Sequence, residues 1–129
     1  MNDLEKTILK MDFEYFGTGK HKIDISVFFE QDNDLLLDVR AEEEIQSIKF
    51  SLAHHCPVLE IPMHEVPSRI NEIPKDKMIG VFCSSGVRCV IIFAYLKSKG
   101  YETVRILSGG YANLTSFLLP GKIYKKING

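Results

Sequence analysis

Apolar and polar positions change character in blocks along most of the chain. From residue 23 onward, short apolar runs typical of strands are separated by charged stretches with helical spacing. The pattern predicts strands at 35–39, 57–61, 78–82 and 103–107, and helices at 41–49, just after Pro67, and at 86–99. A further helical stretch ends the chain. This order is typical of βαβ units and a parallel sheet.

The expected strands are continuously apolar rather than alternating, as in Leu35, Leu36 and Leu37. Continuous apolar strands indicate a sheet that is covered on both faces. The stretch 89–96 is apolar nearly all round, as in a buried helix, and Gly100 stands where a left-handed residue would end that helix. We therefore expect an α/β fold with a central, mostly parallel sheet of about five strands, flanked by helices on both faces.

The first 22 residues read differently from the rest. Leu4, Ile8 and Met11 recur at helical spacing, whereas Phe13 and Tyr15 alternate as in a strand. The secondary structure of this segment stays open between the two. We expect an N-terminal extension, residues 1–22, followed by one domain, residues 23–129.

Composition narrows the class of protein. With 129 residues, of which 45% are hydrophobic and 26% charged, the chain matches one globular domain. Its net charge of −1 offers no overall basic field, so we expect neither a nucleic acid nor a membrane as partner.

The longest apolar stretch, 89–96, is far shorter than the roughly 18 to 20 residues that cross a bilayer, and the start lacks a signal-peptide pattern. The three cysteines suit a reducing compartment, and we expect a cytoplasmic protein without disulfides.

The strongest candidate chemistry follows the strand 78–82, because ligands in such sheets bind beyond the carboxyl ends of strands. The residues there are Cys83, Ser84, Ser85, Gly86, Val87 and Arg88. Small residues and a glycine between a strand and a helix favour a loop whose amide groups stabilise a thiolate or an oxyanion. Arg88 adds a permanent positive charge. The alternative is that Cys83 is only a small buried hydrophobic residue at a strand end.

The wider pattern resembles the rhodanese-homology family of sulfurtransferase domains over roughly residues 23–114. The matching pieces occur in the family's order: Ile25-Ser26, Asp38-Val39-Arg40 with Glu44, Ile61-Pro62, the Cys-x-x-Gly-x-Arg loop at 83–88, and Leu107 with Gly109-Gly110. The resemblance implies a rhodanese-like fold, Cys83 as the nucleophile, and residues 84–88 as the substrate-binding loop.

The sequence departs from the family pattern in three places. The Gly-His-Ile-x-Gly-Ala segment is not recognisable between Glu44 and Ile61, where 49–56 forms a longer connection. Cys89 occupies the position after the loop arginine where the family commonly has serine. Leu114 occupies the position after the paired glycines where the family has an aromatic residue.

Loop length favours one reaction within this fold. Related phosphatases and arsenate reductases have five residues between cysteine and arginine, whereas four separate Cys83 from Arg88. The resemblance therefore implies transfer of a sulfane sulfur from thiosulfate or a persulfide or polysulfide to a thiol or cyanide, through a Cys83 persulfide and without a cofactor. The expected partners are a small sulfur donor and a thiol acceptor, with a protein as an alternative sulfur acceptor. Two alternatives stay open: a rhodanese-like partner-binding or sulfur-relay module without turnover, and, less favoured, a phosphatase or arsenate reductase.

The other polar candidates have plainer interpretations. Asp38, Arg40 and Glu44 read as structural residues near the site, where the i, i+4 spacing of Arg40 and Glu44 favours an ion pair that would fix the connection between strand and helix. His54, His55 and Cys56, together with His64, match no zinc spacing, so we expect no metal.

The two remaining cysteines, Cys56 and Cys89, have less evident roles. Cys56 would be a resolving thiol only if its connection folds over the mouth of the site. Cys89 lies in the first turn of the expected apolar helix and reads as a buried filler. A disulfide between Cys83 and Cys89 would need the start of that helix to distort, since positions six apart across such a loop are not automatically within bridging distance.

Overall fold

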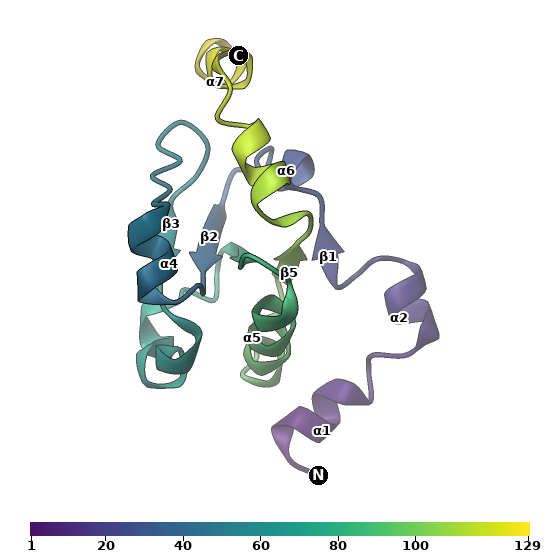
Figure 1. The fold of residues 1–129 in the computed structure, drawn as a ribbon. Coiled ribbons are helices and arrows are strands. Elements are labelled where there is room, and N and C mark those ends of the chain that lie inside the picture. Colours follow the sequence, from purple (N-terminus) through teal and green to yellow (C-terminus); the bar gives the residue numbers. More distant parts are fainter.

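The computed structural model describes residues 1–129, and its core is a sheet of five parallel strands (Figure 1). The strands are β1 (Lys22–Ile23), β2 (Asp34–Asp38), β3 (Val58–Glu60), β4 (Met78–Phe82) and β5 (Val104–Leu107), in the order β1-β5-β4-β2-β3. Every neighbouring pair is parallel. The predicted α/β class and sheet are confirmed, and β4 lies at the centre of the sheet.

The helices follow the predicted alternation. They are α1 (Asp3–Ile8), α2 (Phe13–Gly17), α3 (Ile25–Phe28), α4 (Glu42–Ser47), α5 (Val87–Ser98), α6 (Gly110–Ser116) and α7 (Pro120–Asn128). The helix expected after Pro67 is a 3-10 helix, η2 (Pro67–Glu72), which follows η1 (Met63–Glu65) and is interrupted by the non-helical backbone of Arg69. Gly100 has a φ of 89° just beyond α5, as predicted for its end. None of the helices has the length and apolar character needed to cross a membrane.

The apolar side chains of β2 pack into two hydrophobic clusters, one on each face of the sheet. Leu35 and Leu37 pack into a cluster that includes Ile92 and Leu96 of α5, whereas Leu36 packs into a second cluster with Phe28 of α3. Successive side chains of a strand point to opposite faces, so a strand covered on both sides must be apolar at every position. The sheet therefore has a core on each face, as the sequence indicated.

The N-terminal extension is helical. Asp12 caps α2 by accepting a hydrogen bond from the amide of Tyr15, which favours a helix over the strand that the alternation of Phe13 and Tyr15 allowed. Helix α1 lies against α5, and Met11 and Tyr15 pack against the core. The extension thus covers part of the helix that follows Cys83.

Candidate active site

The site lies where β4 ends and the chain turns into α5. Cys83 follows the last residue of β4, and α5 begins at Val87. A hollow of about 440 Å³ opens beside this turn, between the loop and the segment that joins β5 to α6. Its lining comprises Cys83, Ser84, Ser85, Gly86, Ile106, Leu107, Ser108, Gly109, Gly110 and Tyr111. The carboxyl ends of β4 and β5 therefore form one site.

The sulfur of Cys83 lies in a set of hydrogen-bond donors. The thiol of Cys89 donates to it at 2.9 Å, and the amide of Gly86 donates at 3.1 Å. These bonds, with further help from the amides of Cys89 and Ser85, outweigh burial and hold the pKa of Cys83 at about 5, far below its ordinary value of 9.0. Cys83 is therefore a thiolate at neutral pH.

Gly86 makes this geometry possible. Its φ is 91°, a left-handed conformation that a side chain would disfavour, and it is the residue immediately before α5. The turn aims the Gly86 amide at the sulfur rather than into the helix. The predicted amide cradle is present in this loop.

Cys89 lies in the first turn of α5, and its burial is as predicted, with a side chain 1% exposed. The sequence left open whether its sulfur reaches that of Cys83, and in the structure the two sulfur atoms are in contact. A neighbouring thiolate that accepts its hydrogen bond, together with burial, raises the pKa of Cys89 above its ordinary value. Sequence spacing could not show this, because the fold of the loop decides whether the two side chains converge.

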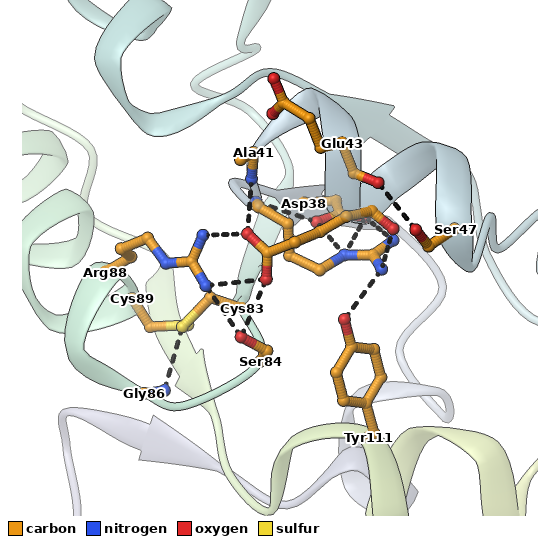
Figure 2. Close-up of polar contacts among 12 residues, drawn as sticks. Asp38, Ala41, Glu43, Ser47, Cys83, Ser84, Gly86, Arg88, Cys89 and Tyr111 are labelled. Atoms are coloured by element: carbon orange, nitrogen blue, oxygen red, sulfur yellow. Dashed lines mark hydrogen bonds and ion pairs between the residues drawn. The ribbon is translucent and has the colours of Figure 1, made fainter.

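Arg88 braces the loop rather than facing the hollow (Figure 2). Its guanidinium donates two hydrogen bonds to Glu44, at 2.5 and 3.0 Å, and one to Ser84 Oγ at 2.8 Å. The Ser84 hydroxyl in turn donates to Glu44 at 3.1 Å. Chiefly because of Arg88, the pKa of Glu44 falls to about 2. Val87 also lies outside the hollow and is exposed, whereas Ser84, Ser85 and Gly86 line it.

The predicted pair between Arg40 and Glu44 is wrong. Arg40 is fully buried, and its guanidinium binds the buried carboxylate of Asp38 through contacts of 2.6, 2.9 and 3.1 Å. It reaches Glu44 only through the backbone carbonyl, at 3.3 Å. Residues two apart meet here because both carboxylate and guanidinium turn inward at the end of β2, where desolvation makes a close ion pair necessary.

Two aromatic residues complete the surroundings of Arg40, and sequence reasoning did not find either. Its guanidinium donates to the hydroxyl of Tyr111 at 3.1 Å and lies 4.8 Å from the ring centre of Phe50. Tyr111 also lines the hollow, so it connects the buried ion pair to the site. Its position directly after Gly109-Gly110 was the available signal.

Cys56 lies away from Cys83. It packs near Asp34 and Leu36 of β2, toward the amino end of that strand, whereas Cys83 follows the carboxyl end of β4. Burial raises the pKa of Cys56 to about 12. The idea that it folds over the mouth as a resolving thiol is therefore wrong.

The histidines of the metal-like group have separate surroundings. His55 stacks on Phe29 and its Nε2 atom lies 2.8 Å from the carbonyl of Phe117, while His54 and His64 are exposed. No group of histidine, cysteine and carboxylate side chains in the structure is arranged to hold a metal ion.

Comparisons with known proteins agree with this architecture. A sulfurtransferase of Allochromatium vinosum is 41% identical over 76 residues, which are 59% of this chain and 66% of that protein. A tRNA sulfurtransferase of Mannheimia succiniciproducens is 32% identical over 81 residues, 63% of this chain but 16% of that protein. The chain thus spans less than two thirds of the length of either relative.

Solved structures show the same fold. The NAD-dependent persulfide reductase from A. fulgidus superposes with a TM-score of 0.59 at 37% identity, over 77% of this chain and 17% of that one. A rhodanese-related protein from Thermoplasma volcanium, 21% identical, has a TM-score of 0.61 over 76% and 90% of the two chains. The family described as Rhodanese-like domain matches residues 26–116. The resemblance noted in the sequence is confirmed, and the chain belongs to the rhodanese-like domain family.

Proposed function

We propose that this protein is a sulfurtransferase that carries a sulfane sulfur as a persulfide on Cys83. The observation that carries the proposal is the thiolate itself, which opens onto a hollow and receives hydrogen bonds from the Gly86 amide and the Cys89 thiol. A thiolate is the form of cysteine that attacks sulfur. The names of the relatives, sulfurtransferase and persulfide reductase, support the same class of chemistry.

The first half-reaction loads the protein. The Cys83 thiolate attacks the outer sulfur of a donor such as thiosulfate, a new S–S bond forms, and the donor's S–S bond breaks with its electron pair leaving on sulfite. The negative charge then resides on the outer sulfur of the persulfide. Amide groups that stabilised the thiolate remain beside the inner sulfur, so no neighbouring general base is required.

The second half-reaction unloads it. A thiolate or cyanide attacks the outer sulfur, and the Cys83 thiolate leaves as the S–S bond breaks. A small-molecule thiol and a thiol on a protein partner are both suitable acceptors. The return to a reduced thiolate suits the reducing, cytoplasmic environment expected from the cysteine content.

The lining of the hollow bears on the choice of donor. Its residues carry no positive charge, and Arg88 is occupied by Glu44 and Ser84. An anionic donor would be held by backbone amides and hydroxyl groups without a cation, so persulfide and polysulfide donors are as suitable as thiosulfate. The same arrangement disfavours a phosphatase or arsenate reductase, because no guanidinium faces an oxyanion above Cys83.

Intact-mass measurement tests this function. We would incubate the wild type with thiosulfate or polysulfide and then add cyanide or a thiol, with Cys83→Ser as the inactive variant and Cys56→Ala as the matched control. The wild type and Cys56→Ala should each gain one sulfur, and the acceptor should remove it. No gain with either donor would favour the partner-binding module instead. Phosphate-ester hydrolysis that disappears in Cys83→Ser would favour the phosphatase.

A further inference from the structure

A second thiol lies against the sulfur that carries the proposed persulfide. Cys89 Sγ is 2.9 Å from Cys83 Sγ and 3.4 Å from the carbonyl oxygen of Val81. The transfer cycle described above uses Cys89 only as a hydrogen-bond donor, a task that a hydroxyl could equally perform. Two thiols in direct contact are, in addition, a pair able to form a disulfide.

The two sulfurs occupy different surroundings. Both cysteines belong to the core cluster that holds Val81 and Ile92, but only Cys83 also lines the hollow. The core leaves no room for another sulfur atom, so the outer sulfur of a Cys83 persulfide must extend into the hollow. The inner sulfur then has the outer sulfur on one side and Cys89 on the other. Thiol–disulfide exchange needs this arrangement, because the attacking sulfur enters opposite the one that leaves.

We propose that Cys89 is a resolving residue that reduces the Cys83 persulfide and releases its outer sulfur as hydrosulfide. This inference rests on the proposed function, because it needs the persulfide to form. It gives the protein a second outcome, in which the sulfane sulfur is reduced to sulfide instead of being passed to an acceptor.

The step balances within the protein. A lone pair of Cys89 Sγ forms a bond to Cys83 Sγ, and the bond between Cys83 Sγ and the outer sulfur breaks with its electron pair on the outer sulfur. The Cys89 thiol gives up one proton and the departing sulfur takes up one from the solvent of the hollow, so the product is hydrosulfide and no net proton is consumed. The two cysteines are oxidised to a disulfide, and the sulfane sulfur is reduced. Two molecules of an external thiol, or one dithiol, then reduce the disulfide and are themselves oxidised to a disulfide.

The protonation of Cys89 suits this order of events. While Cys83 is a free thiolate, its charge and the burial of Cys89 keep the Cys89 proton in place, since both raise the pKa of that thiol. Loading with sulfur moves the negative charge from the inner to the outer sulfur, so a neighbouring thiolate no longer holds the Cys89 proton in place and Cys89 can react as a thiolate. The sulfur atoms must then approach from 2.9 Å to the bonded distance of about 2.05 Å, a movement within the reach of two side chains.

A single-turnover experiment tests the proposal. The protein is loaded with thiosulfate, or with polysulfide where thiosulfate gives no adduct, and the excess donor is removed by gel filtration. Released sulfide and intact mass are then followed without added thiol. The wild type should release up to one sulfide per persulfide, and its mass should change from one sulfur above the reduced protein to two hydrogens below it.

The position of Arg88 makes the disulfide easy to locate. After alkylation of free thiols, trypsin cuts between Cys83 and Cys89, and the two cysteines fall in peptides 78–88 and 89–97. A disulfide joins these two peptides into one species, which a reductant separates. This measurement uses the wild-type protein and does not depend on any variant.

Variants identify the resolving thiol. Cys89→Ser keeps a hydrogen-bond donor beside Cys83, so it should load with sulfur but release sulfide at least about tenfold more slowly until a thiol is added. Cys56→Ala should behave as the wild type. If circular dichroism shows that Cys89→Ser is unfolded, Cys89→Ala takes its place.

The outcomes separate the two proposals. A wild type that keeps its persulfide as long as Cys89→Ser does, or a Cys89→Ser variant that releases sulfide at the wild-type rate, would overturn the resolving role and leave sulfur transfer standing. If neither Cys89→Ser nor the wild type gains sulfur from either donor, and the wild type forms no disulfide and releases no sulfide, the result would count against the proposed function itself.

Discussion

The guanidinium of Arg88 donates to both carboxylate oxygens of Glu44, a residue 44 positions earlier in the chain. Glu44 lies on α4 after β2, and Arg88 lies in the first turn of α5 after β4. The two strands are neighbours in the sheet, so the ion pair ties the start of one helix to the start of the other. The loop that carries Cys83 is held between them (Figure 2).

Replacing Glu44 should loosen this loop. In Glu44→Gln the amide accepts less strongly from Arg88, and we expect the free energy of unfolding at pH 7 to fall by about 1 kcal/mol, since the pair is partly exposed to solvent. Sulfur loading of Cys83 should slow at the same time. Urea unfolding and intact mass measure the two effects, and Glu43→Gln on the exposed side of the same helix is the matched control.

The stabilisation by Glu44 should depend on pH in a defined window. Its pKa is lowered from 4.5 to about 2 in the folded protein, so the folded state favours the ionised form. The stability difference between wild type and Glu44→Gln is therefore complete above pH 4.5 and disappears as the pH falls toward 2. A difference that stays constant through this range would show that the carboxylate charge is not what holds the loop.

Alkylation should report the thiolate of Cys83. The rate of reaction with iodoacetamide at Cys83, followed by peptide mass, should rise with pH around a midpoint near 5 and be level at neutral pH. Because the Cys89 thiol is the largest cause of the low pKa, Cys89→Ala should move the midpoint upward. Cys89→Ser should move it less, since its hydroxyl can donate in the same place. Equal midpoints in all three proteins would exclude Cys89 as the donor.

A methyl group at Gly110 should disturb the far wall of the site. Gly110 has a φ of 55°, and a Cβ atom there would lie 3.1 Å from the carbonyl oxygen of Ser84. Gly110→Ala should therefore displace the loop that holds Cys83. We expect a clear decrease in the rate of sulfur loading and only a small decrease in the melting temperature. Gly121→Ala is the control, because a Cβ atom at that position meets nothing within 4 Å. Loading at the wild-type rate in Gly110→Ala would mean that the loop is not held by this contact.

The sequence was sufficient for most of the fold and for the position of the loop that holds Cys83. Strand β4 was predicted with its observed limits, Met78–Phe82. A continuous apolar run that is followed by small residues and then by a helical pattern is typical of a buried strand in a βα unit. The cradle at Gly86 followed from the same local pattern. Local information suffices where the structure is made by neighbours in the sequence.

The partners of the charged residues could not be predicted in this way. The i, i+4 rule paired Arg40 with Glu44, but the rule applies to exposed helix surfaces, and Arg40 is buried beside Asp38. Because Arg40 pairs with Asp38, the carboxylate of Glu44 forms its ion pair with Arg88, which belongs to a different βα unit. Tyr111 and the contact of Cys89 with Cys83 were missed for the same reason, because tertiary packing, not spacing, brings these side chains together.

The buried pair of Arg40 and Asp38 should be among the most sensitive features of the fold. Arg40→Met removes one charge and leaves the Asp38 carboxylate buried without its partner, so we expect a loss of about 3 to 5 kcal/mol in the free energy of unfolding. The double variant Asp38→Asn/Arg40→Met buries no charge and should recover part of that loss. Urea unfolding of the wild type, both single variants and the double variant measures the coupling. Strictly additive losses would mean that the two side chains stabilise the protein independently, in spite of their contact.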